Sequence, residues 1–278
     1  DDKSAIAIIV EAMYVIAESK IPCGPLELVF TICEEIGLLG AKHLDYRLIS
    51  AEYGYALDTS DTESIITRAP AANRFTVEVL GKSAHAGAEP EKGINAISLA
   101  SRAIAGLELG RVDAETTSNI GMIECDGATN IVPDRVRLKG EVRSHDPVKL
   151  EAVTQEILDA FEIAVKTFAG RDEEKDLPRV QVDLENEFPR THIPADHPVV
   201  RNAQAAARQL GRQLETKKTG GGSDANIFFD KGIVTGVIGT GMQEIHTVRE
   251  WIRLDDMARM VALLVEIIRL HGAGGRSS

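Results

Sequence analysis

The order of the predicted helices and strands constrains the fold of this chain most strongly. Apolar side chains recur at helical or strand spacing in the first and last parts of the chain, and strand and helix alternate there. Such alternation predicts an α/β domain with a parallel sheet. The predicted helices of this domain are 5–17, 41–44, 199–210 and 254–270, and its predicted strands are 26–30, 52–57 and 233–238.

The middle of the chain has a different pattern. Between residues 72 and 187, strands and helices are predicted in the order β-α-β-β-α-β, which is the ferredoxin-like split pattern. The segment 74–80 alternates polar and apolar side chains, as half-exposed antiparallel strands do. We therefore expect an α/β domain made of residues 1–71 and 188–278, with an inserted ferredoxin-like domain at 72–187.

Charge and composition exclude several classes of function. The 278 residues carry a formal net charge of −12, which argues against nucleic acid as a partner. No apolar run approaches the ~20 residues of a membrane-spanning helix. The three cysteines, Cys23, Cys33 and Cys125, are odd in number and widely spaced, which indicates free thiols and a reducing cytoplasm.

Two adjacent acids, Glu34 and Glu35, follow the predicted strand 26–30. Gly37 and Gly40 allow the backbone to turn closely just after them. At an irregular strand end both carboxylates can address one site, so that one binds a metal while the other moves a proton. The alternative is a solvated acidic turn without chemistry.

Further acids and one histidine are predicted at the carboxyl ends of strands or at the start of a helix. Ligands gather at the carboxyl ends of strands in open α/β sheets. Converging carboxylates and an imidazole are the donors that a hydrolytic zinc site needs. Each residue also has a purely structural interpretation, as a helix cap, a turn cap or a surface histidine. The candidates are Asp1, Asp2, Glu34, Glu35, Asp58 and His246.

Longer motifs carry a resemblance to a known family. In chain order they are DDKS at 1–4, TICEEIGLLGA at 31–41, ALD at 56–58, GKSAHAG at 81–87, ATNIVPD at 128–134, GEVRSHD at 140–146, TGGGSDAN at 219–226 and GTGMQEIHT at 239–247. Together they resemble the co-catalytic di-zinc exopeptidases of the aminoacylase and carboxypeptidase G2 type, and within them the peptidase T-like branch. The resemblance covers essentially the whole chain.

The resemblance implies roles for the acidic residues and the histidine. Asp1 matches the carboxylate that bridges two zinc ions, with a cis Asp1–Asp2 peptide bond. Glu34 matches the general base. Glu35 and His246 match ligands of one zinc ion, and Asp58 matches a ligand of the other. Mn or Co are alternatives to zinc.

The resemblance also implies roles in substrate binding. His85, Asn130 and Arg143 match groups of the inserted domain, which serves as a lid, and Gly221 and Gly222 match a substrate-binding turn. His85 is expected to stabilise the oxyanion and to reach the site of a partner subunit in a homodimer built through the lid domains. A plain salt bridge on a sheet face is the alternative for Arg143.

The activity implied is zinc-dependent hydrolysis of small peptides, by an aminopeptidase or tripeptidase of the cytoplasm. Hydrolysis of N-acyl or N-carbamoyl amino acids is a second possibility, because the same metal centre serves both kinds of amide. A non-catalytic dimeric scaffold is a third. The family carries a His-x-Asp motif upstream of DDK, and we expect the present chain to lack that part of the sheet and one metal ligand.

Overall fold

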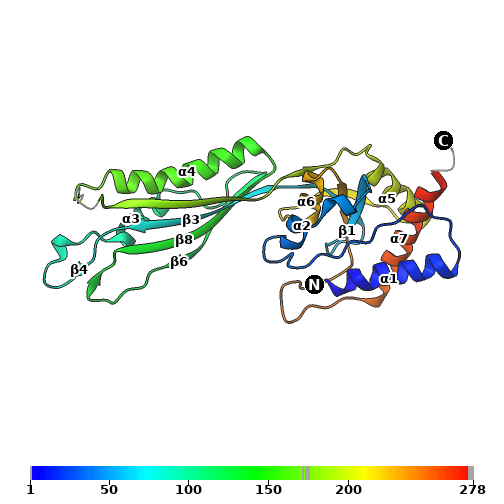
Figure 1. Cartoon of the computed structure of the whole chain (residues 1–278), viewed down its shortest axis with the longest axis horizontal. Coiled ribbons are helices and arrows are strands. Elements are labelled where there is room, and N and C mark those ends of the chain that lie inside the picture. The colour runs from blue at the N-terminus through cyan, green and yellow to red at the C-terminus, as the bar shows by residue number, and fades with distance from the viewer. Residues whose placement is uncertain (1, 171, 173–175, 275–278) are drawn as a thin grey trace. The chain divides into compact units, whose positions relative to one another are not determined.

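The computed structural model of the chain describes residues 2–170, 172 and 176–274, and it divides the chain into two compact units (Figure 1). Unit 1 consists of Asp1–Ala69 and Thr191–Ser278, and unit 2 consists of Pro70–Arg190. The sequence predicts limits of 72 and 187 for the inserted domain, which lie within three residues of the limits of unit 2.

Unit 1 contains a five-stranded sheet with the order β1-β12-β2-β10, and β11 also pairs with β2. The parallel pairs are β1 with β12 and β11 with β2, whereas β2 is antiparallel to both β12 and β10. The expectation of a parallel sheet is therefore wrong, because the sheet is mixed. The strands are β1 (Tyr53–Leu57), β2 (Ser64–Ala69), β10 (Thr191–His192), β11 (Glu215–Lys218) and β12 (Val234–Ile238).

Three long helices build the core of unit 1. Helix α7 (Leu254–Gly274) packs against both α1 (Lys3–Glu18) and α5 (Pro198–Gln209). In α1 the buried residues are Ile8, Ala12 and Ile16, which lie on one face of the helix at intervals of four. The helical periodicity of the sequence therefore predicted these elements correctly.

Short helices complete unit 1. Helix α2 (Leu39–His43) and the 3₁₀ turn η1 (Tyr46–Leu48) follow the acidic motif, and α6 (Asp224–Asp230) follows the glycine-rich turn. Ser223 is the N-cap of α6, and it forms a reciprocal capping box with Asn226.

The predicted strand at 26–30 is not a strand in the structure. Leu26, Leu28, Val29 and Phe30 are all more than a third exposed. An apolar run becomes a strand only where a neighbouring strand supplies hydrogen bonds, and β1 pairs with β12 alone in the described part of the chain. Composition alone therefore misassigned this segment.

Unit 2 is built on a five-stranded antiparallel sheet with the order β5-β6-β8-β3-β9. The two helices α3 and α4 pack together over one hydrophobic core with the sheet (Figure 1). The long elements follow the β-α-β-β-α-β order inferred from the sequence. They are β3 (Ala71–Leu80), α3 (Ala96–Ala105), β6 (Thr116–Glu124), β8 (Arg135–Ser144), α4 (Pro147–Lys166) and β9 (Arg179–Phe188), with β5 at Gly110–Arg111.

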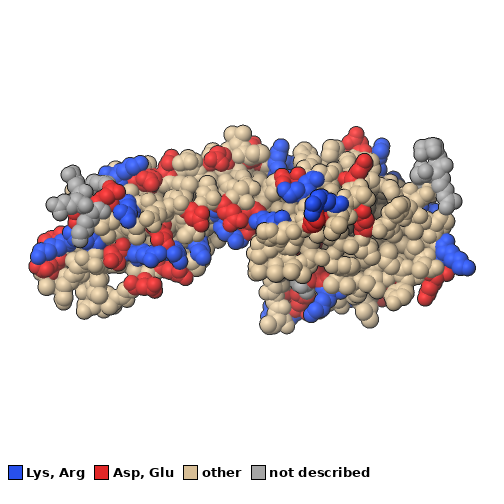
Figure 2. Space-filling model, in the orientation of Figure 1, with Lys and Arg blue, Asp and Glu red and all other residues tan. Residues whose placement is uncertain are grey.

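A second, two-stranded sheet in unit 2 pairs β4 (Ala84–His85) with β7 (Ile131–Val132), and the 3₁₀ turn η2 (Pro90–Lys92) follows β4. Acidic and basic side chains are interspersed over the face shown in Figure 2. Among the described residues, none of the helices has the length and apolar character needed to cross a membrane.

Candidate active site

Glu34 lies in a compact turn rather than at a strand end. Its carbonyl oxygen accepts hydrogen bonds from the amides of Gly37, at 3.1 Å, and Leu38, at 2.8 Å. The turn is closed by the amide of Gly40, which donates to the carbonyl of Ile32 at 2.9 Å. A Cβ atom at Gly40 would lie only 2.4 Å from that carbonyl oxygen, so this position requires glycine.

The carboxylates of unit 1 are close enough to perturb one another. The pKa of Glu34 is raised to about 8, mainly by burial and additionally by the negative charges of Asp58, Glu35 and Asp224. The pKa of Asp58 is raised to about 6, also mainly by burial. The negative charges of Asp2, Glu35 and Asp224 contribute to this rise. Mutually repelling carboxylates of this kind favour binding of a cation.

His246 and Glu35 lie side by side. The Nε2 atom of His246 is 3.1 Å from Oε2 and 3.2 Å from Oε1 of Glu35, although the two residues are 211 positions apart. His246 has a φ of +62°, in the left-handed region that non-glycine residues rarely adopt. The fold therefore brings together the two residues that the sequence motifs assigned to one metal ion.

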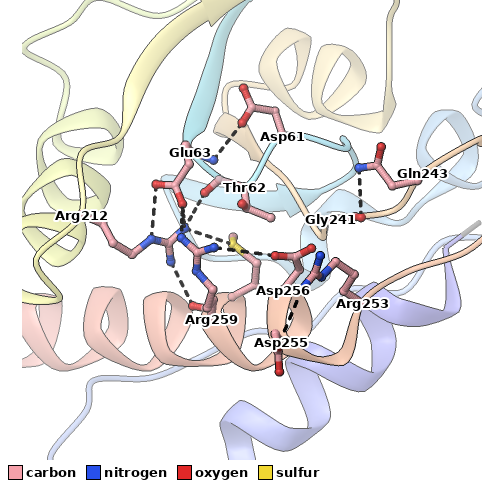
Figure 3. Close-up of polar contacts among 11 residues, drawn as sticks. Asp61, Thr62, Glu63, Arg212, Gly241, Gln243, Arg253, Asp255, Asp256 and Arg259 are labelled. Carbon is pink, nitrogen blue, oxygen red and sulfur yellow. Dashed lines mark hydrogen bonds and ion pairs between the residues drawn. The ribbon is translucent and has the colours of Figure 1, made fainter.

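Asp58 directly follows β1, and its amide donates to the carbonyl of Ile238 at 3.1 Å. The chain after Asp58 is held by an ion-pair network (Figure 3). Arg212 donates to the carbonyl of Thr62 at 2.6 Å and to Glu63 at 3.1 Å, and Arg259 donates to Glu63 at 2.6 Å. The network ties this loop to helix α7.

The loop that carries His246 is fixed by close backbone approaches to the same region. A Cβ atom at Gly239 would lie 2.2 Å from the carbonyl oxygen of Asp61, and one at Gly241 would lie 2.6 Å from the Cβ of Asp256. The amide of Thr240 also donates to the carbonyl of Thr59 at 2.8 Å. The loops of Asp58 and His246 are therefore positioned by one shared set of contacts.

Asp1 and the Asp1–Asp2 peptide bond, which the sequence motifs made central, lie outside the described residues. Asp2 is the N-cap of α1: its Oδ1 accepts from the Ser4 hydroxyl and, at 2.9 Å, from the amide of Ala5. Its Oδ2 is buried and has no hydrogen-bond partner in the described structure. A buried, unpaired carboxylate oxygen is available to a cation.

These residues fit a metal by donor chemistry. Carboxylate oxygens and an imidazole nitrogen suit zinc, and carboxylates also suit manganese. Within the described part of the chain, however, no three or more His, Cys, Asp or Glu side chains come together closely enough to hold an ion. The site therefore has the donors of a metal centre, but the described side chains do not form a closed coordination shell.

Asp224 and Thr31 belong to this site although neither was among the candidate residues, which were drawn from the same motifs. Asp224 is the first residue of α6, its pKa is raised by burial, and it accepts a hydrogen bond from the hydroxyl of Thr31. Gly221 and Gly222 lie in the turn just before Ser223, and the amide of Gly221 is held by the hydroxyl of Thr219 at 3.2 Å. The acid within the glycine-rich motif was the available signal.

His85 and Asn130 lie together in unit 2. The amide of Ala86 donates to the carbonyl of Asn130 at 2.9 Å, next to the β4–β7 pairing. The Nδ1 atom of His85 accepts from the amides of Gly87 and Ala88, each at 3.1 Å. In the neutral ring the proton is therefore on Nε2, which makes Nε2 a hydrogen-bond donor.

Arg143, on β8, forms an ion pair with Glu141, with Nε 2.9 Å from Oε1 and Nη2 3.1 Å from Oε2. Its guanidinium also lies 5.8 Å from the ring centroid of Phe188. The salt bridge that was the alternative interpretation of Arg143 is thus present in unit 2.

Comparison with known proteins shows likenesses at the level of family and fold. The pattern of the family described as Peptidase family M20/M25/M40 matches residues 1–270. An uncharacterized protein, YqjE of Bacillus subtilis, is 42% identical over 269 residues, which is 96% of this chain and 70% of that protein. The chain spans 64% to 70% of the length of the curated relatives it matches.

Solved structures agree with this match. An aminopeptidase PepT from Bacillus cereus is 39% identical with a TM-score of 0.86, and a tripeptidase from Staphylococcus aureus is 36% identical with a TM-score of 0.89. Each comparison covers 98% of this chain and 71% of the other. A Bacillus subtilis protein described as a dinuclear metal binding peptidase, YXEP, shares the fold at 17% identity and a TM-score of 0.69.

Proposed function

Because the chain belongs to peptidase family M20/M25/M40, as its motifs predicted, we propose that it is a zinc-dependent exopeptidase that hydrolyses small peptides with Glu34 as general base. The observation that carries the proposal is the grouping, in unit 1, of the partly buried Glu34 with Asp58, Glu35 and Asp224: burial, together with these negative charges, raises the pKa of Glu34 to about 8. Perturbed titratable groups of this kind gather at catalytic sites.

Glu35, Asp58 and His246 would hold the metal, and Asp1 would be a further ligand. A bound metal supplies electrophilic polarisation of the scissile carbonyl and of water. The same positive charge favours the ionised form of Glu34, so that Glu34 is a competent base near neutral pH. The relative described as a dinuclear metal binding peptidase supports two ions per site.

Glu34 would take a proton from the attacking water and return it to the leaving amine. His85 would donate a hydrogen bond from Nε2–H to the developing oxyanion, because its Nδ1 already accepts from two backbone amides. Arg143 and Asn130 would bind the carboxylate of the substrate, with Arg143 exchanging its pairing with Glu141 for that carboxylate.

The substrate class follows from the relatives as a proposal: tripeptides with a free N-terminus. Two related structures are described as an aminopeptidase PepT and a tripeptidase, and these are more similar to this chain than the amidase-type neighbours are. A small peptide also fits a site that must bind both a carboxylate and the scissile amide.

The test is a panel of tripeptides, dipeptides and N-acyl amino acids, assayed with zinc, manganese or cobalt added after chelation. We expect release of the N-terminal residue from tripeptides, with N-acyl amino acids left intact. Glu34→Gln is the matched inactive control. Cleavage of N-acyl or N-carbamoyl amino acids alone would move the protein to the amidohydrolase class, and no hydrolysis with any metal would favour a scaffold.

A further inference from the structure

A hydrogen bond between residues 193 positions apart supports the loop of Glu34. The hydroxyl of Thr31 donates to Oδ2 of Asp224, the first residue of α6. Thr31 is three residues before Glu34, at the start of the turn that also carries Glu35. This contact therefore joins the turn to helix α6, which lies far from it in the sequence.

Helix α6 is a rigid support for that contact. Its residues Ala225, Asn226 and Ile227 are buried, and Ser223 caps it in a box with Asn226. Phe228 of the same helix contacts Tyr46 edge to face, with ring centroids 5.7 Å apart. The helix is thereby fixed on sides other than the one that faces Thr31.

The same helix also supports the far end of the turn. Tyr46, which contacts α6, donates from its hydroxyl to the carbonyl of Ala41 at 2.9 Å. Ala41 and Leu38 are buried, with 0% and 4% of their surface exposed. The segment from Thr31 to Ala41 is therefore held at both ends by groups attached to α6.

Between those two ends the segment is closed by its own backbone hydrogen bonds, but its backbone is strained and two of its apolar side chains are exposed. Cys33 and Leu38 both have a φ of +58°, a conformation unfavourable for residues other than glycine. Ile32 and Ile36 are exposed by 74% and 66%. Strained backbone persists only where the surrounding structure holds it in place, and the Thr31 contact adds to the backbone hydrogen bonds that do so here.

We propose that Asp224 is a positioning residue, which acts through the Thr31 hydroxyl to set the geometry of Glu34 and Glu35. Its other oxygen, Oδ1, is buried from solvent and has no hydrogen-bond partner in the described structure, so the bond from Thr31 is the side-chain contact through which Asp224 acts on the turn. The link to catalysis rests on the proposed function, whereas the link to the conformation of the turn does not.

The experiment compares variants on both sides of the contact in the protein as the cell makes it. Thr31→Val and Asp224→Ala remove the hydrogen bond. Thr31→Ser and Asp224→Asn retain a hydroxyl donor and an oxygen acceptor. Thr216→Val, at an exposed position of β11, is the control for the substitution itself.

Amide hydrogen exchange of the segment 31–41 is the first measurement, with α7 as internal reference. Loss of this hydrogen bond predicts exchange about tenfold faster in Thr31→Val and Asp224→Ala. Thr31→Ser, Asp224→Asn and Thr216→Val should exchange as the unmodified protein does. The double variant Thr31→Val/Asp224→Ala should exchange no faster than either single variant, because both remove the same bond.

Steady-state kinetics on a tripeptide is the second measurement. A displaced general base predicts a kcat lower by about ten- to a hundredfold in the two disruptive variants, with KM changed less than about twofold. Unchanged exchange in Thr31→Val, or faster exchange with unchanged kcat, would overturn the proposal. So would equal effects of Asp224→Asn and Asp224→Ala, since charge rather than the bond would then matter.

Two disruptive variants are used so that the test can still be made if one of them does not fold. If Thr31→Val does not fold, Asp224→Ala tests the same bond from the other side. If the unmodified protein cleaves no peptide but the variants show the expected exchange pattern, the proposed peptidase function is wrong. The role of Asp224 in positioning the turn would still hold.

Discussion

The Nε2 atom of His246 lies 3.1 Å from a carboxylate oxygen of Glu35. Glu35 is in the turn before α2, whereas His246 is in the loop after β12, so only the folded chain brings them together. Both side chains are more than half exposed, which leaves the pair accessible from solvent. A histidine beside a carboxylate in an acidic site is the donor pair on which the predictions about the metal depend.

We predict that Glu34→Gln abolishes peptide hydrolysis while the metal content stays nearly unchanged. Loss of a general base costs about 10²–10⁴ in rate, and Glu34 is assigned to proton transfer rather than to coordination. Metal analysis after dialysis and single-turnover assays measure the two properties separately. If the variant loses its metal and regains activity when metal is added, the roles of Glu34 and Glu35 are exchanged.

We predict that His246→Ala weakens metal binding more than substrate binding. Removing one of few ligands leaves poor coordination geometry, so the metal content after dialysis should fall. His43→Ala, at a histidine outside the acidic cluster, is the matched control. Two ions per chain still bound tightly in His246→Ala would remove His246 from the metal site.

We predict that the metal-free protein becomes less stable as the pH rises. The folded-state pKa of Glu34 is raised from 4.5 to about 8, mainly by burial, and that of Asp58 from 3.8 to about 6, also mainly by burial. The folded protein then binds more protons than the unfolded chain does. The stabilisation is complete below the unfolded pKa values and is lost as the pH rises through the folded ones.

Denaturant unfolding of chelator-treated protein at several values between pH 4.5 and 8.5 measures this loss. In Glu34→Gln the fall between pH 6 and pH 8.5 should be smaller, because the principal titrating group is gone. Added metal should also reduce it, since a cation favours the ionised carboxylates. Equal falls in the variant and the unmodified protein would assign the pH dependence to other groups.

We predict that Gly241→Ala destabilises the protein more than Gly211→Ala does. Both glycines have positive φ angles, +97° and +69°. A Cβ atom at Gly241 would lie 2.6 Å from the Cβ of Asp256, whereas one at Gly211 would meet nothing within 4 Å. The control isolates the backbone cost of about 1–2 kcal/mol. Thermal unfolding should show a larger loss of stability for Gly241→Ala than for Gly211→Ala. Equal losses of stability would mean that the loop moves to accommodate the added Cβ atom without a free-energy cost.

We propose a homodimer in which unit 2 mediates the contact and His85 serves the site of the partner subunit. Mixing His85→Ala with Glu34→Gln after dissociation would put half of the dimers in mixed form, and about a quarter of all sites would then be complete. Activity should reappear on mixing. Mixed dimers detected by mass spectrometry without activity would show that His85 acts in its own chain or not at all.

Much of this fold follows from local sequence patterns. Alternation in 74–80 predicted strand β3, and the helical spacing of apolar side chains in 5–17 predicted α1, where the structure buries Ile8, Ala12 and Ile16. These assignments succeeded because side-chain periodicity reports which face of one element is buried. The motifs also singled out Glu35, Asp58 and His246 as candidate metal ligands, because they are short, continuous stretches with the residue types of a metal site, and that assignment stays a prediction.

Other features were decided by tertiary structure alone. The run 26–30 has the composition of a strand but no strand pairs with it, and β2 enters the sheet of unit 1 antiparallel to β12. The hydrogen bond from Thr31 to Asp224 spans 193 positions and leaves no periodic trace in the sequence. Local patterns record the burial of one element, whereas strand pairing and long-range hydrogen bonds depend on which partner the whole fold places opposite it.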